Sequence, residues 1–109
     1  MTSHEEFYLD ELPQSSKEIL SVSDLNQLAK ILLEENFSKV VVEGEISNIA
    51  VPNSGHWYLT LKDKKSQIRC AMFTNRNRFV RFEPKNGNFI TAKGKLSICG
   101  SRGDYQLII

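Results

Sequence analysis

The sequence predicts a mainly β fold, a five-stranded Greek-key barrel preceded by one N-terminal α-helix. Two observations predict it. Apolar residues recur at helical spacing in one segment near the N-terminus, and from Lys39 onward they alternate with polar residues, which is the period of a β-strand. The 109 residues are enough for one domain with a single modest core. We therefore divide the chain into a leader over residues 1–20 and a folded domain over residues 21–109.

The leader is acidic and polar, contains Pro13, and shows no sustained hydrophobic periodicity. We expect it to be flexible. It lacks the basic and then apolar pattern of a secretory signal, and no apolar run in the chain approaches the roughly 20 residues that a membrane-spanning helix needs. A cytoplasmic protein without a membrane partner is therefore expected.

A helix is predicted over residues 23–36, where Ser23 or Asp24 can cap the N-terminus and Asn36 can end the helix. Its apolar residues form one stripe: Val22, Leu25, Leu28, Ala29 and Leu32, with Phe37 beyond the end. Such a stripe packs against its own domain more often than against a partner. We therefore expect the stripe to lie on the barrel.

Five strands follow the helix. They are predicted over residues 40–47, 55–63, 67–73, 89–98 and 105–109. Gly44 stands where a small barrel needs a strong bend, and a short helical turn is predicted around residues 77–80. This arrangement is typical of the OB-fold: one helix, five strands, and the longest insertion between the third and fourth strands. In OB-folds, strands 2 and 3 and the loops between strands 1–2 and 4–5 commonly bind oligonucleotides.

The second and third strands have two different faces. One face suits a barrel interior and consists of Trp57, Leu59, Leu61, Ile68, Cys70 and Met72. The other consists of Tyr58, Thr60, Lys62, Arg69, Ala71 and Phe73. Its aromatic and basic side chains are suited to stacking on bases and holding phosphates. The alternative is that Tyr58 and Phe73 cover a hydrophobic seam under the helix or a neighbouring domain.

The net charge of +1 conceals an asymmetry. Residues 1–37 hold eight acidic and two basic residues, whereas residues 38–109 hold five acidic and twelve basic ones. A basic β region favours a nucleic-acid partner over plain solvation of a surface. The predicted nucleic-acid-binding residues are Tyr58, Lys62, Arg69, Phe73, Arg76, Arg81, Lys93, Lys95 and Arg102.

Catalytic and metal-binding patterns are weak. His56 has no acidic residue placed beside it, so we expect a hydrogen-bonded structural histidine. Cys70 lacks a nucleophile signature, and neither zinc-ligand spacing nor a phosphate-binding loop occurs. We expect no catalytic residue, metal or cofactor in this domain. Cys70 and Cys99 are expected to be reduced and buried. The sequence does not show whether their Cα atoms are close enough for a disulfide.

Several motifs occur in an order that resembles one family. They are Ser21–Asn26, Val42–Asn48, Ser54–Asp63, Arg69–Phe73 and Arg102–Leu107. Together they closely resemble the N-terminal domain of the large subunit of bacterial exodeoxyribonuclease VII, and the resemblance runs from about Leu20 to Ile109.

The resemblance implies an OB-fold domain that binds single-stranded DNA. In the family, a catalytic region absent here hydrolyses the strand to oligonucleotides, in DNA degradation and repair, and other absent regions assemble with small subunits. Tyr58, Lys62, Arg69 and Phe73 fall in family motifs, and Arg102 in the matching loop. The remaining candidates rest on charge and strand alternation alone. We expect a domain of a longer protein, and the metal requirement of that enzyme stays open.

Two other functions remain open from the sequence. The domain can be a protein–protein docking module within the nuclease complex, because its helix is apolar. It can also be an RNA-binding OB domain, because stacking and phosphate contacts do not distinguish the two sugars.

Overall fold

A computed structural model describes residues 19–109, and the predicted flexible leader therefore lies outside the described residues except for its last two. The elements are α1 (Val22–Asn36), β1 (Val40–Ala50), β2 (Trp57–Lys62), β3 (Gln67–Met72), α2 (Thr74–Asn77), β4 (Phe89–Cys99) and β5 (Asp104–Ile108). The predicted helical turn around residues 77–80 is present but begins three residues earlier, as α2, and continues to the hydrogen bond from the N–H of Val80 to the carbonyl oxygen of Asn77.

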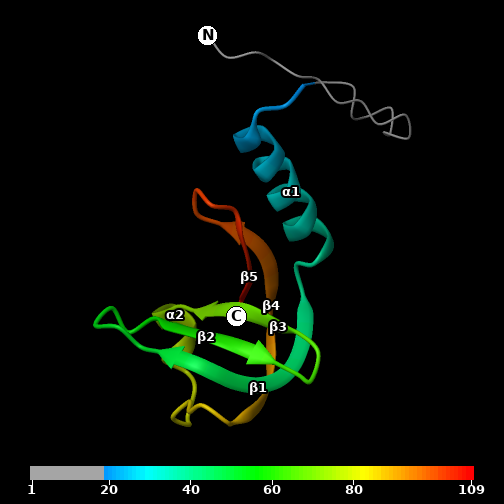
Figure 1. Ribbon diagram of the computed structural model, residues 1–109. Helices are drawn as coiled ribbons and strands as arrows, with labels where there is room; N and C mark the ends of the chain where they lie inside the picture. The colour runs from blue at the N-terminus through cyan, green and yellow to red at the C-terminus, as the bar shows by residue number, and fades with distance from the viewer. Residues whose placement is uncertain (1–18) are drawn as a thin grey trace.

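The strands form a closed barrel in the order β1-β2-β3-β5-β4 (Figure 1). Neighbours are antiparallel except β3 and β5, which run parallel. In Figure 1, α1 rises from the barrel near β4 and β5, and α2 lies at the left beside β2. The predicted fold class, a five-stranded barrel with an N-terminal helix, is confirmed.

The inward side chains of the strands fill the barrel. The buried core consists of Ile46, Leu59, Leu61, Cys70, Ala92, Leu96 and Leu107. Trp57 and Ile68 pack against it and are partly buried. The alternation therefore identified the interior face of β2 and β3 correctly. Fully burying an aliphatic side chain of this size contributes about 1.5–3 kcal/mol, so the core is the main source of stability.

α1 begins earlier than predicted because Ser21 caps it. The Ser21 hydroxyl accepts a 3.0 Å hydrogen bond from the backbone N–H of Asp24, which makes Ser21 the N-cap and Val22 the first helical residue. The predicted caps Ser23 and Asp24 are wrong, since both lie inside the first turn. The predicted end at Asn36 is correct.

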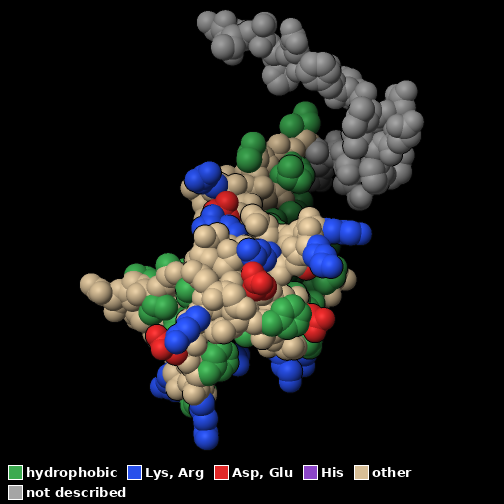
Figure 2. All heavy atoms as spheres, turned by 60° about the horizontal axis from the view of Figure 1, so that its bottom comes forward, with side chains coloured by type: hydrophobic (Ala, Val, Ile, Leu, Met, Phe, Trp, Pro, Cys, Tyr) green, Lys and Arg blue, Asp and Glu red, His purple; other side chains and the backbone are tan. Residues whose placement is uncertain are grey.

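The apolar stripe of α1 does not lie on the barrel, which contradicts the prediction. Its residues are mostly exposed: Val22 77%, Leu25 57%, Leu28 46% and Leu32 60%. The helix instead meets β4 through Leu33 and Glu34, and the Ser97 hydroxyl donates a 2.8 Å hydrogen bond to Oε2 of Glu34. Figure 2 shows hydrophobic side chains uncovered in this part of the molecule. Ser97 is buried where the helix meets β4.

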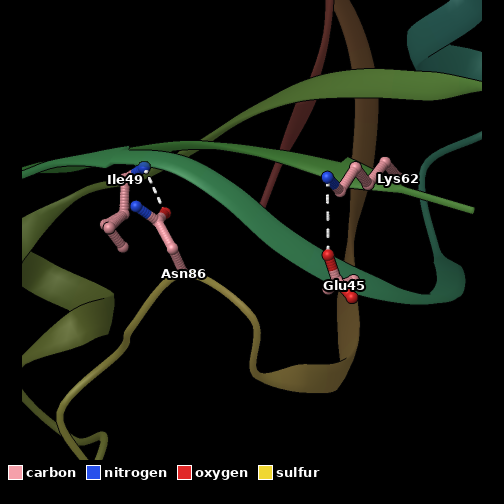
Figure 3. Close-up of polar contacts among 4 residues, drawn as sticks. All are labelled: Glu45, Ile49, Lys62 and Asn86. Carbon is pink, nitrogen blue, oxygen red and sulfur yellow. Dashed lines mark hydrogen bonds and ion pairs between the residues drawn. The ribbon is translucent and has the colours of Figure 1, made fainter.

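β1 is longer than predicted and has two partners. Residues 40–45 pair with β4 and residues 45–50 pair with β2. The strand does not end at Ser47, because a bulge before Ala50 absorbs Asn48, whose φ is 51°, and pairing then continues. The side-chain oxygen of Asn86 accepts a 2.9 Å hydrogen bond from the N–H of Ile49, which fixes the connection before β4 against the bulge (Figure 3).

No helix among residues 19–109 is long and apolar enough to cross a membrane.

Candidate nucleic-acid interface

The β2–β3 hairpin is held in register by its turn. Asp63 accepts 2.8 Å hydrogen bonds from the backbone N–H groups of Lys65 and Ser66, and these bonds lower the pKa of its carboxyl group. The resulting register places Tyr58 opposite Ala71. Of the predicted outer face, Tyr58, Lys62, Arg69 and Phe73 are exposed, whereas the prediction is wrong for Thr60 and Ala71, which are buried.

One row of outward side chains crosses four strands. Tyr58 is opposite Ala71, Ala71 is opposite Ile108, and Ile108 is opposite Lys95. Tyr58 is 42% exposed, whereas Ala71 is buried. Ala71 and Ile108 thus lie between an aromatic ring on β2 and a lysine on β4. The row leads from the predicted hairpin surface onto the other side of the barrel.

Phe73 follows β3 and is fixed by its neighbours. The His56 ring meets the Phe73 ring edge-on, with centroids 5.1 Å apart. Nδ1 of His56 accepts a 3.1 Å hydrogen bond from the N–H of Thr74, and the Asn77 side chain donates to the carbonyl oxygens of Gly55 and Met72 at 2.9 and 3.0 Å. His56 therefore has the structural role expected from the sequence, and Phe73 is held with part of its ring exposed.

A groove of about 430 Å³ lies beside Phe73, and we call it the Phe73 groove. It is bounded by the start of β1, the outer face of β4, the first residues of α2 and the end of β5. Its basic side chains are Lys39, Arg76, Lys93 and Lys95. Among the described residues that line it, none is acidic. Four cations and an aromatic ring thus share one concave surface.

The groove gathers some of the predicted binding residues. Phe73, Arg76, Lys93 and Lys95 line it, and the row of outward side chains connects Tyr58 to it. Lys95 also lies 4.0 Å from Glu34, at the limit of an ion pair. Exposed pairs of this kind contribute about 0–1 kcal/mol, so the lysine stays available to a phosphate.

Other predicted residues lie elsewhere. Lys62 is at the far end of β2, where Nζ is 3.4 Å from Oε2 of Glu45 (Figure 3). Arg69 is opposite Thr60 and two residues along β3 from Ala71, about 7 Å away along the strand.

Two more predicted residues lie in connections. Arg81 is in the segment between α2 and β4 and does not line the Phe73 groove. Arg102 is in the β4–β5 turn, where the neighbouring Gly103 approaches Asn26 of α1. That turn is therefore beside the helix, beyond the last paired residues of β4 and β5.

Sequence reasoning missed two groove residues. Lys39 precedes β1 directly, and Val41 is an outward aliphatic side chain that is 64% exposed and opposite Lys93. The alternation of the first strand separates Val41 from Val40 and Val42, but it does not say which neighbour lies beside Val41. Its pairing with β4, about fifty residues away in the sequence, was the missing information.

Comparisons with known proteins agree with this geometry. A family model described as an OB-fold nucleic acid binding domain matches residues 20–109. The exodeoxyribonuclease 7 large subunit of Vibrio campbellii is 52% identical over 98 residues, which is 90% of this chain and 22% of that protein. The subunit of Shewanella frigidimarina is 53% identical over 91 residues, 84% of this chain and 20% of that protein. These matches confirm the resemblance that the sequence motifs indicate.

The chain spans about a fifth of the length of the curated relatives it matches. A solved structure, RecG bound to a three-way DNA junction, aligns with 67% of this chain and 10% of its own, with a TM-score of 0.47 and 15% sequence identity. That likeness is too weak to carry an argument.

Proposed function

The chain belongs to the family of OB-fold nucleic acid binding domains, and from this premise we propose that it binds single-stranded DNA across the Phe73 groove and the adjoining Tyr58 row. The observation that carries the proposal is the groove itself, with Phe73, four cations and no acidic residue among its described lining residues. Phosphates are attracted to such a surface, and unpaired bases can stack on its aromatic rings.

Single strands suit this surface better than a duplex. Tyr58 and Phe73 present rings at the outer face of the barrel, and stacking on such rings needs bases that are free of their own stacks. Each stacked base contributes about 1–3 kcal/mol, largely independent of base identity. We therefore expect weak sequence preference and strong salt dependence.

We further propose that the domain holds substrate for a nuclease. Its relatives are named exodeoxyribonuclease 7 large subunits, and this chain matches only 20–22% of their length, so hydrolysis would be performed by a catalytic region outside this chain. A cytoplasmic role in DNA degradation or repair, and assembly with small subunits through other regions, belong to the same proposal. The domain itself is proposed to need no metal or cofactor.

Fluorescence anisotropy tests the binding proposal. Labelled oligo(dT), oligo(U) and a duplex of the same length are titrated with the protein at two salt concentrations. We expect tightest binding to oligo(dT), and replacing Tyr58 or Phe73 by Ala should weaken it by about 1–3 kcal/mol each. Phe89→Ala is the matched control, because Phe89 is 68% exposed and lines neither the groove nor the Tyr58 row.

Equal binding to the duplex would contradict the proposal, and a preference for oligo(U) would favour the RNA alternative. Circular dichroism of each variant shows whether the fold is intact.

A second candidate function, docking onto another region of a nuclease complex, is favoured by α1. The stripe of Val22, Leu25, Leu28 and Leu32 is exposed in the described chain. Leu25→Gln with Leu32→Gln should leave DNA binding unchanged. If docking is the function, the same pair should abolish association with the remainder of a full-length relative, measured by size-exclusion chromatography.

A further inference from the structure

A second hollow opens at the end of the barrel beside α2, and we call it the end hollow. Its volume is about 600 Å³. Three aromatic side chains line it, Trp57, Phe79 and Phe82, together with aliphatic side chains such as Met72. Trp57 and Met72 are opposite each other at the end of the β2–β3 ladder, so the hollow occupies the open mouth of the barrel.

The end hollow adjoins the Phe73 groove. Arg76, Lys93 and Ile109 line both. Among the described residues that line the hollow, none is acidic. Two cations therefore stand on the shared edge, where the phosphates of a strand passing from groove to hollow would lie.

The aromatic walls are open to solvent. Phe79 is 68% exposed and Phe82 is 53% exposed. The guanidinium of Arg78 lies 4.8 Å from the centroid of the Phe79 ring, a cation–π contact that steadies this ring. Isolated exposed apolar residues are ordinary, but exposed rings that line a hollow beside cations are typical of a binding surface.

The support beneath these rings is fixed. The buried side chain of Asn77 bonds to the carbonyl oxygens of Gly55 and Met72, which anchors α2 immediately before Phe79. The backbone N–H of Val80 donates a 3.0 Å hydrogen bond to the carbonyl oxygen of Asn77, which continues the turn. The Phe79 ring is thus carried by a hydrogen-bonded turn, and Phe82 lies two residues beyond its end.

We propose that the end hollow receives an unstacked base from the single strand that lies in the Phe73 groove. This inference rests on the proposed function. The strand turns around the edge formed by Arg76 and Lys93, its phosphates stay with these cations, and the next base enters between the aromatic walls. Because those walls are apolar, the hollow accepts any base. The bound base fixes the point at which the strand leaves the outer face of the barrel.

The test uses Trp57, the single tryptophan of the chain, as an internal probe. Unlabelled oligo(dT) of increasing length is added while tryptophan fluorescence and, in parallel, anisotropy of a labelled oligonucleotide are recorded. We expect short oligonucleotides to bind without changing Trp57 emission, and longer ones to bind more tightly and quench it, because their extra base stacks beside the indole ring.

Phe79→Ala with Phe82→Ala should weaken binding of the longer oligonucleotide about tenfold and leave the shortest binding oligonucleotide unaffected. Phe89→Ala, which removes an exposed ring outside both the groove and the hollow, should change neither.

Binding with no quenching at any length, or an unchanged affinity of the double variant, overturns the inference and leaves the proposed function standing. The Trp57 fluorescence measurement uses the unaltered protein, so it tests the inference even if the double variant does not fold. Absence of DNA binding by the unaltered protein overturns the proposed function and the inference together. An apolar protein segment as the true occupant would appear as DNA binding with constant Trp57 emission.

Discussion

The ring of His56 meets the ring of Phe73 at 86°, with 5.1 Å between centroids. The same imidazole accepts the N–H of Thr74, so one side chain fixes both the aromatic ring of the groove and the first turn of α2. His56 is a positioning residue for DNA binding in our proposal, and it acts through Phe73.

The first prediction concerns this pair. His56→Ala should weaken oligo(dT) binding about 2- to 10-fold, since an aromatic pair contributes about 0.5–1.5 kcal/mol, and should have no further effect in a Phe73→Ala background. Anisotropy on the single and double variants measures the coupling. Additive effects of the two substitutions would show that His56 does not act through Phe73.

The second prediction concerns the cations of the Phe73 groove. Lys93→Gln with Lys95→Gln should reduce the slope of log affinity against log salt by about 1.4, because each phosphate contact on a single strand contributes about 0.7. Lys64→Gln with Lys65→Gln removes the same charge from the exposed β2–β3 turn and is the matched control. Equal changes from both pairs would indicate a general charge effect rather than contacts in the groove.

The third prediction concerns Gly94, on which the groove floor depends. A β-carbon at this position would overlap the carbonyl oxygen of Ile108 and lie 2.9 Å from its carbonyl carbon and 3.0 Å from Cα of Ile109. Gly94→Ala should therefore lower the free energy of unfolding by about 1–3 kcal/mol, measured by urea denaturation. Thr91→Val, at an exposed position of the same strand, should stay within about 0.5 kcal/mol of the unaltered protein. A stable Gly94→Ala protein would mean that the end of β5 moves without cost.

The fourth prediction concerns the two cysteines, which are free thiols. Burial raises the pKa of the Cys70 thiol to about 11, so almost none of the reactive thiolate exists at pH 8. A thiol reagent should modify Cys99 in the folded protein and Cys70 only after denaturation, which mass spectrometry can follow. Because the ionised form of Cys70 is disfavoured only in the folded state, stability should fall as the pH rises from about 9 to 11. Rapid labelling of Cys70 at neutral pH would contradict its burial.

The barrel could be predicted from the sequence because its core follows period two. Leu59 and Leu61 alternate with Tyr58, Thr60 and Lys62, and the structure buries both leucines. The length of β1 could not be predicted, because Asn48 reads as a turn residue whereas here it forms a bulge. Helical spacing likewise shows that Leu25 and Leu28 share a face, but it does not say whether anything covers that face.

The candidate site was predictable only in part, for a related reason. Alternation placed Lys93 and Lys95 outward, and the structure agrees. Their meeting with Phe73 depends on the pairing of β5 with both β3 and β4, which joins segments far apart in the chain. The ion pair between Lys62 and Glu45 likewise depends on a long-range pairing, because the register of β1 against β2 places the two residues opposite each other.

The parallel pairing of β5 with β3 also governs when this molecule can fold. Leu107 is completely buried, and the strand that carries it is the last of the barrel to be synthesised. On the ribosome, β2 and β3 can form their hairpin early, but the barrel cannot close until residues around Leu107 have emerged. Such non-local closure is intrinsically slow, and the unfinished core stays exposed meanwhile. The nascent chain is therefore most vulnerable to aggregation just before its fifth strand is complete.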